Sequence, residues 1–248
     1  MRSISLALAL LTATSAAIGA EVLPNCYKRS SVEMPPLYST VLLVDQNSAY
    51  NFKARKTANE LLEKLKGNEM LLLASYRKAK LDIGLLGIVP TFLDSSEIDA
   101  TDFPTAFSKS SYFRCLKKSK FEYPQKIRSA MATLFPFGAE DGPVGDDHLQ
   151  VLTALMSQYV PTNAVGFTLY WFSDGSVDPE QFKQVEAQLE YPEQVVNEIS
   201  ARGLSIPALP KDSKVIMYTK GSYRGEQSGV SWQSYFDAIG VPFERKMY

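Results

Sequence analysis

Carboxylates stand directly after the two strongest apolar runs of the sequence. Asp45 follows the run 38–44, and Asp174 follows the run 165–172 with one serine between them. Asp147 is a third acidic residue, and it stands before an apolar helical pattern. Carboxylate oxygens are the ligands that hard divalent cations prefer, so these residues could hold Mg²⁺ or Ca²⁺. A cation held in this way could bridge to a partner or assist a hydrolytic reaction.

Alternating strands and helices are expected to position these carboxylates. The expected strands are 38–44, 165–172 and 214–219, and the expected helices are 52–65, 124–134, 149–159, 178–190, 192–202 and 232–239. This alternation predicts an α/β fold of three layers, with a Rossmann-like, mostly parallel sheet flanked by helices. In such sheets ligands bind beyond the carboxyl ends of the strands, which is where Asp45 and Asp174 fall.

Two stretches are less regular. The apolar runs 70–76 and 83–89 either pair as a hairpin or are linked by a continuing helix. Residues 94–123 are rich in Ser, Asp, Lys and aromatic residues, and we expect an irregular insertion there, with the basic group 117–120 on a solvated face. No linker divides the chain, so residues 21–248 are expected to form one domain.

The first twenty residues have the three parts of a secretory signal peptide. Arg2 supplies a positive charge, residues 4–11 form a short apolar core, and small residues end at Ala20. An uncleaved anchor is the alternative. The apolar core is shorter than the roughly 20 residues that cross a bilayer. We therefore expect a periplasmic or secreted mature protein of bacterial type that does not insert into the membrane.

Composition excludes several classes of site. The chain has one His and two Cys among 248 residues, which excludes a multi-His metal centre and a four-Cys zinc site. Its net charge of −1 argues against nucleic-acid binding through bulk charge. In an oxidising compartment Cys26 and Cys115 are expected to form a disulfide, and two buried free thiols are the alternative. His148 is more typical of a surface or hydrogen-bonded structural side chain than of a catalytic base.

The acidic motifs resemble those of the von Willebrand factor A-like (vWA) domain, over about residues 38–240. That family has a first strand ending in Asp-x-Ser-x-Ser, a Thr-containing loop before a later helix, and a strand ending in Thr-Asp-Gly. The matching segments here are Asp45-Gln-Asn-Ser-Ala49, Val144-Gly-Asp-Asp-His148 and Ser173-Asp-Gly175. The resemblance implies a non-enzymatic protein-binding domain whose metal-ion-dependent adhesion site holds a cation that an acidic group of a protein partner completes.

This sequence departs from the family pattern in ways that make the site degenerate. Asn47 replaces the first Ser and can still offer an amide oxygen, but Ala49 replaces the second Ser and cannot coordinate. The loop lacks Thr, and Asp147 stands in its place. The resemblance therefore implies Asp45, Asn47, Asp147 and Asp174 as the ligands of Mg²⁺ or Ca²⁺.

Other functions stay open at this stage. The same acidic edge could serve a metal-assisted hydrolase, and the insertion 94–123 could make the contacts of a structural subunit of an envelope or secretion assembly. Asp45 could also simply close its strand as a turn or cap residue. The sequence contains no Gly-x-Ser-x-Gly, Walker A, His-Glu-x-x-His or Gly-x-Gly-x-x-Gly motif. Ser75-x-x-Lys78 matches one hydrolase element, but it follows an apolar strand instead of opening a helix.

Overall fold

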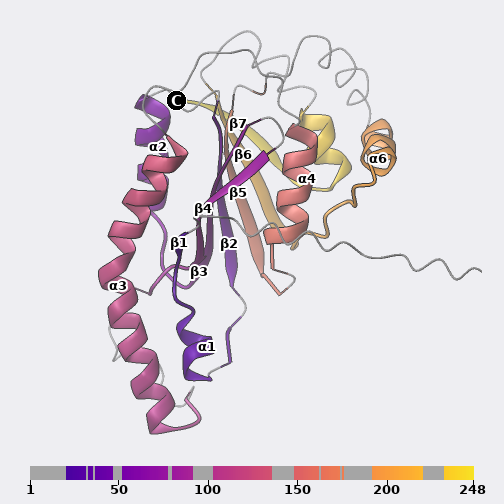
Figure 1. The fold of residues 1–248 in the computed structure, drawn as a ribbon. Coiled ribbons are helices and arrows are strands. Elements are labelled where there is room, and N and C mark those ends of the chain that lie inside the picture. Colours follow the sequence, from indigo (N-terminus) through magenta and orange to yellow (C-terminus); the bar gives the residue numbers. More distant parts are fainter. Residues whose placement is uncertain are drawn as a thin grey trace, which may run out of the picture.

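A seven-stranded sheet flanked by helices on both faces forms the described part of the protein in the computed structural model (Figure 1). The structure describes residues 21–31, 33–35, 37–46, 52–77, 80–91, 103–135, 148–161, 163–173, 175, 192–219 and 232–248. The strands are β1 (Glu21–Val22), β2 (Tyr38–Asp45), β3 (Glu69–Arg77), β4 (Lys80–Ile88), β5 (Gly166–Phe172), β6 (Asp212–Thr219) and β7 (Phe243–Met247). The predicted α/β fold is therefore confirmed.

The sheet has the strand order β1-β4-β3-β2-β5-β6-β7. Only the β3–β4 pair is antiparallel among the pairs of described strands. From β4 to β7 this order is the 3-2-1-4-5-6 arrangement of doubly wound α/β folds. The chain changes winding direction between β2 and β5, and the carboxyl ends of these two strands flank that switch point.

Helices cover the two faces of the sheet separately. They are α1 (Cys26–Ser30), α2 (Phe52–Leu62), α3 (Ala106–Leu134), α4 (His148–Tyr159), α6 (Pro192–Ala201) and a helix at residues 232–238. In Figure 1, α2 and α3 lie on one face, and α4 and α6 lie on the other. Each face has its own apolar core, so the molecule has three layers.

The alternation of side chains along β2 supplies both cores. Val41 and Leu43 pack on the α4 side, whereas Leu42 and Val44 pack on the α2–α3 side. All four are at most 1% exposed. A strand buried on both faces needs apolar residues at every position, which is why the sequence shows a continuous apolar run instead of alternation.

The predicted strands and most predicted helices lie where the sequence placed them. Residues 70–76 and 83–89 take the hairpin alternative, as β3 and β4. Three elements were missed. The edge strand β7 has exposed charged residues and no apolar alternation, and the N-terminal lead-in contains β1 and α1. The predicted helix 178–190 lies outside the described residues.

The expected irregular structure of 94–123 is wrong for residues 106–123. They are the first part of α3, a continuous helix of 29 residues that contains Pro124 inside it rather than at its first turn. Thr105 caps the helix, because its Oγ1 accepts a hydrogen bond of 3.0 Å from the Ser108 backbone N–H. Proline is tolerated here because its ring lies on the exposed side of the helix, where a long helix can curve around the core.

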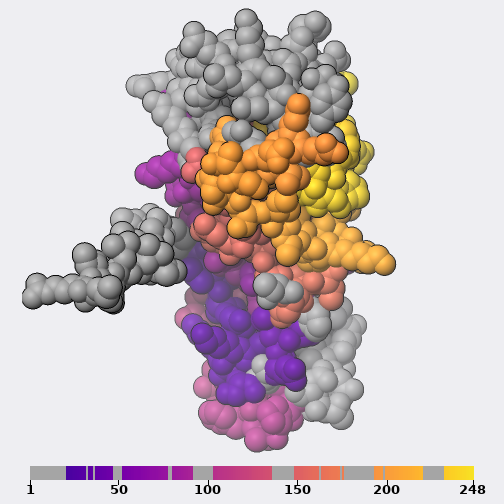
Figure 2. All heavy atoms as spheres, turned by 90° about the vertical axis from the view of Figure 1, so that its right-hand side faces the viewer, coloured from indigo at the N-terminus to yellow at the C-terminus, as the bar shows by residue number. Residues whose placement is uncertain are grey.

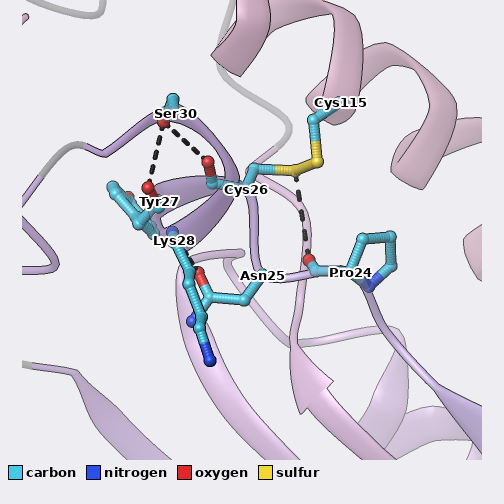
Figure 3. Close-up of a disulfide and its surroundings, with 7 residues drawn as sticks. All are labelled: Pro24, Asn25, Cys26, Tyr27, Lys28, Ser30 and Cys115. Atoms are coloured by element: carbon cyan, nitrogen blue, oxygen red, sulfur yellow. Dashed lines mark hydrogen bonds between the residues drawn. A yellow bond between two sulfur atoms is a disulfide. The ribbon is translucent and has the colours of Figure 1, made fainter. Parts of the chain in front are cut away.

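A disulfide joins α1 to α3 at the end of the molecule where the parallel strands begin (Figure 3). Cys26 and Cys115 have Cα atoms 5.5 Å apart and are 6% and 8% exposed. A satellite apolar cluster that includes Tyr27, Tyr112 and Leu116 surrounds them. Figure 1 shows the N-terminal part of α3 extending with α1 beyond the sheet, and in Figure 2 the pink residues of early α3 form the lower end of the molecule. The bridge therefore fastens the half of α3 that the sheet does not support.

The search for membrane-spanning helices gives a negative result for the described residues. Even α3, at 29 residues, is too polar to lie across a bilayer.

Candidate functional site

The topological switch point carries a pair of buried polar side chains. Asp45 is the last residue of β2, and Ser173 directly follows β5 on the neighbouring strand. Asp45 is 1% exposed and Ser173 is 0% exposed. Ligands of doubly wound sheets bind at the carboxyl ends beside such a switch point, so the fold itself marks this edge as the candidate site.

A short chain of hydrogen bonds fixes this pair. The Ser173 hydroxyl donates to Oδ2 of Asp45 over 2.9 Å, and the Gly175 backbone N–H donates to the Ser173 Oγ over 2.9 Å. The Ser173 backbone N–H donates to the Tyr218 carbonyl, which ties the end of β5 to β6. The carboxylate of Asp45 is consequently held in a defined place by elements from three neighbouring strands.

An aromatic cluster lies on the α4 side of the sheet, next to this pair. The indole N–H of Trp171 donates to the Tyr76 hydroxyl over 2.9 Å. Tyr76 Oη and Nδ1 of His148 are 2.8 Å apart, and the tautomer of the imidazole decides which of them donates. Trp232 packs edge-on against both His148 and Trp171. All four side chains are at most 2% exposed, so the cluster is a buried, hydrogen-bonded part of the core.

This cluster positions the start of α4 at the candidate site. Tyr76 is the register partner of Asp45 on β3, and it contacts His148, the first residue of α4. Helix N-termini favour nearby negative charge, because their free backbone N–H groups point outward. The described geometry therefore brings three things to one edge: the end of β2, the end of β5 and the N-terminus of α4.

Of the four predicted metal ligands, the structure describes only Asp45. Asn47, Asp147 and Asp174 lie outside the described residues, so their convergence on Asp45 stays a prediction. Within the part of the chain that the structure describes, no group of three or more His, Cys, Asp or Glu residues gathers in one place. The switch point thus supplies one buried carboxylate and one hydroxyl to any ligand.

The sequence did not identify the partners that hold Asp45. Ser173 was noted only as the residue before Asp174, although a serine at the end of a buried strand is a signal for such a contact. Tyr76 and Trp171 stand in the apolar runs 70–76 and 165–172, and the structure adds the hydrogen bond between them. His148 is a buried, bonded side chain, which is one of the two roles that its sequence context favoured.

Comparison with known proteins identifies no family. No family model matches the chain, and no curated protein matches it. Among solved structures, an aerotolerance-related membrane protein from Bacteroides fragilis NCTC 9343, crystallised with multiple mutations to serines, is similar with a TM-score of 0.40. The two are 10% identical over 85% of this chain and 92% of that chain. At this level of likeness, any functional inference has to come from the site itself.

Proposed function

We propose that this protein is a secreted or periplasmic, vWA-like domain that binds another protein without catalysing a reaction. Its binding edge is the carboxyl end of β2 and β5, where Asp45, Asn47, Asp147 and Asp174 hold Mg²⁺ or Ca²⁺. An acidic side chain of the partner completes the coordination of that cation. The observation that carries the proposal is the buried carboxylate of Asp45 at the topological switch point.

The chemistry of Asp45 supports a cation at this edge. A carboxylate that is 1% exposed has lost most of its hydration, and the Ser173 hydroxyl is one of the groups that hold it in place. A carboxylate held at the carboxyl end of a strand in this way is a ligand that a divalent cation prefers. The described residues offer three side-chain oxygens at this edge: the two of the Asp45 carboxylate and the Ser173 hydroxyl. Oxygen ligands suit Mg²⁺ and Ca²⁺.

The surroundings of His148 support a binding function over an enzymatic one. General bases have to reach the proton that they remove, and His148 is 1% exposed among three aromatic side chains. Its hydrogen bond with Tyr76 gives it a structural task, the attachment of α4 to β3. The hydrolase alternative would therefore use the acidic edge and its cation without the imidazole of His148.

Thermal unfolding in the presence of cations tests this proposal. Millimolar Mg²⁺, Ca²⁺ and Mn²⁺ are each added to protein stripped with EDTA. A ligand at 100 times its Kd stabilises a folded protein by about 2.7 kcal/mol, which corresponds to roughly 5 °C or more in the midpoint for a chain of this size. The same cation should then support capture of a protein partner, and EDTA should release that partner.

Two matched variants locate the effect. Asp45→Asn keeps an acceptor for Ser173 but removes the charge, so its unfolding midpoint should not respond to cations. Asp212→Asn makes the same change at the exposed amino end of β6, and its response should equal that of the unmodified protein. No shift of the unmodified protein with any of the three cations would refute the metal-dependent form of the proposal.

A further inference from the structure

The outward face of α3 carries a stripe of basic and aromatic side chains, with one glutamine among them. Going along the helix, its members are separated by seven, four, three, four and three positions. At 3.6 residues per turn these spacings place them within a sector of about 80°. The members, which we call the α3 stripe, are all exposed: Phe107, Arg114, Lys118, Phe121, Gln125 and Arg128.

Two phenylalanines stand on this stripe in solvent. Phe107 is 82% exposed and Phe121 is 83% exposed, although the opposite side of the same helix is buried through residues such as Leu116 and Met131. The two rings are 14 positions apart, or about 21 Å along the helix axis. Single exposed apolar residues are ordinary on protein surfaces, but two bulky rings on one line among cations form a pattern that indicates a binding surface.

The charge of α3 is opposite to that of the rest of the protein. Residues 106–134 contain seven Lys or Arg and one Glu, a net charge of +6. Since the whole chain carries −1, the remaining residues carry −7. A negatively charged surface would therefore attract this helix and repel the rest of the molecule, which fixes the orientation in which the protein approaches it.

We propose that the α3 stripe binds the surface of a bilayer that contains anionic phospholipids. Arg114, Lys118 and Arg128 contact lipid phosphates, and Phe107 and Phe121 enter the boundary between headgroups and acyl chains. Helices that lie in the membrane interface combine basic residues with Phe, Trp or Leu in this way. The helix lies on the membrane and does not cross it, in agreement with the absence of a spanning helix from the described residues.

The geometry of the stripe favours a membrane over other anionic partners. The outward side of α3 is convex, and a fluid bilayer surface can adapt to a convex helix without a matching groove. Phosphates of a nucleic-acid duplex would engage the cations but give no role to two phenylalanine rings about 21 Å apart on one line. A protein partner would need an apolar pocket for each ring, whereas a bilayer accepts both without a matching shape.

The fold holds α3 in place before any membrane is met. The disulfide to Cys26 and the satellite cluster around Tyr112 fasten its N-terminal half. The apolar core on the α2–α3 side of the sheet holds its C-terminal half. Lys126, nearer the buried side of the helix, forms an ion pair of 3.0 Å with Glu21 of β1. Binding therefore requires no folding of the helix, and the ordering cost that isolated interfacial peptides meet is absent.

One ion pair already lies on the stripe. Lys118 Nζ is 3.6 Å from Glu122 Oε1, and the Lys118 side chain is 65% exposed. Surface pairs of this kind contribute little, so a lipid phosphate can replace the Glu122 carboxylate.

Vesicle flotation tests the proposal with the purified mature protein, residues 21–248, which lacks the apolar segment of the predicted signal peptide. The probes are 100 nm vesicles of phosphatidylcholine alone and of phosphatidylcholine with 30% phosphatidylglycerol, in low and high salt. Binding is expected only to the anionic vesicles, and it should weaken as salt rises. Arg114→Glu, Lys118→Glu and Arg128→Glu together should reduce the affinity more than 100-fold, since each basic side chain near such a surface contributes on the order of fivefold.

Two further variants separate this stripe from bulk charge and from simple loss of folding. Arg202→Glu, Lys211→Glu and Lys214→Glu make the same change in net charge at exposed positions outside α3 and should weaken binding far less than the α3 triple variant. Phe121→Trp should show a blue shift of its fluorescence on anionic vesicles alone, because an exposed ring has entered an apolar layer. Circular dichroism checks that every variant is folded.

Each of the following results would overturn the proposal: no binding to anionic vesicles, equal loss of binding in the two triple variants, or no blue shift in Phe121→Trp. Binding of a 30-base-pair DNA duplex as tight as the binding of vesicles would assign the stripe to nucleic acid instead. Binding of the unmodified protein to anionic vesicles, lost in the α3 triple variant and kept in the other triple variant, would establish the α3 stripe as a membrane-binding surface.

Discussion

The carboxyl edge of the sheet and the α3 stripe differ in how they present charge. At the edge, the acidic side chain of Asp45 is buried and accepts a hydrogen bond from Ser173, which follows the neighbouring strand. On the stripe, positive charge is spread along an exposed helix. The first arrangement depends on strand order and register, so a mutation there changes stability and binding together. The second depends on helical period alone, so its charges can change with little effect on stability.

Removal of the disulfide is expected to have the largest effect. Cys26→Ser with Cys115→Ser should lower the free energy of unfolding by about 4 kcal/mol, because a link across 89 positions restricts the unfolded chain. Urea denaturation measures this loss. Hydrogen exchange should rise first in α1 and the N-terminal half of α3, while the carboxyl edge stays protected. A loss below about 1 kcal/mol, or faster exchange at the carboxyl edge first, would contradict this view of the two regions.

The next largest effect is expected at the carboxyl edge itself. Ser173→Ala removes the donor to Asp45 and the acceptor of the Gly175 N–H, so the free energy of unfolding should fall by about 2.5 kcal/mol. Ser200→Ala is the control, since its hydroxyl bonds only the exposed Val196 carbonyl on α6, and its effect should stay within about 0.5 kcal/mol. Similar losses in both variants would show that the edge is not the tightly held site described here.

Alkaline pH should affect the layer beneath α3. Burial, with the negative charge of Glu69 as a second cause, raises the pKa of Tyr123 to about 12. The unfolded phenol titrates near pH 10, so its protonated form stabilises the folded state fully below pH 10 and this contribution is lost as pH rises through 12. Urea denaturation measures the free energy of unfolding at pH 10 and at pH 12. The decrease between the two should be about 2 kcal/mol smaller in Tyr123→Phe than in the unmodified protein. An equal decrease in the two proteins would contradict the raised pKa of Tyr123.

The smallest change in stability is expected on the α3 stripe. Glu122→Gln removes an exposed ion pair with Lys118 and should alter the free energy of unfolding by less than about 0.5 kcal/mol. Its affinity for anionic vesicles should nevertheless rise severalfold, since a repelling charge is gone. Glu60→Gln, which breaks the similar pair with Lys56 on α2, should leave vesicle binding nearly unchanged. A large stability loss in Glu122→Gln would show that the stripe is structural.

Strands that are buried on both faces could be predicted from the sequence. Elements whose buried positions include polar residues, or that are mostly exposed, were missed. The continuous apolar runs of β2 and β5 were sufficient to place them. The helical period of α3 was concealed because its buried face includes Ser108, Cys115 and Ser119 beside its apolar residues. The edge strand β7 is charged and mostly exposed, so its sequence shows no pattern of buried apolar residues.

The candidate site shows a different limit. Asp45 could be identified because it ends a buried strand, and that position follows from local sequence. Its bond to Ser173 could not, because the two residues are 128 positions apart and meet only when β5 joins β2. Strand order is a property of the whole fold, and no local pattern states it. The same holds for the contact of Tyr76 with His148, across 72 positions.

The position of the disulfide in the chain has a consequence for biogenesis. Both cysteines precede β5 in the chain. The bridge can therefore close before the residues of β5 and β6 have emerged and can pair. The strands β2, β3 and β4 are also consecutive, and they can pair without waiting for later segments. An oxidised N-terminal half can therefore form first and offer the free edge of β2 as a template for the C-terminal half.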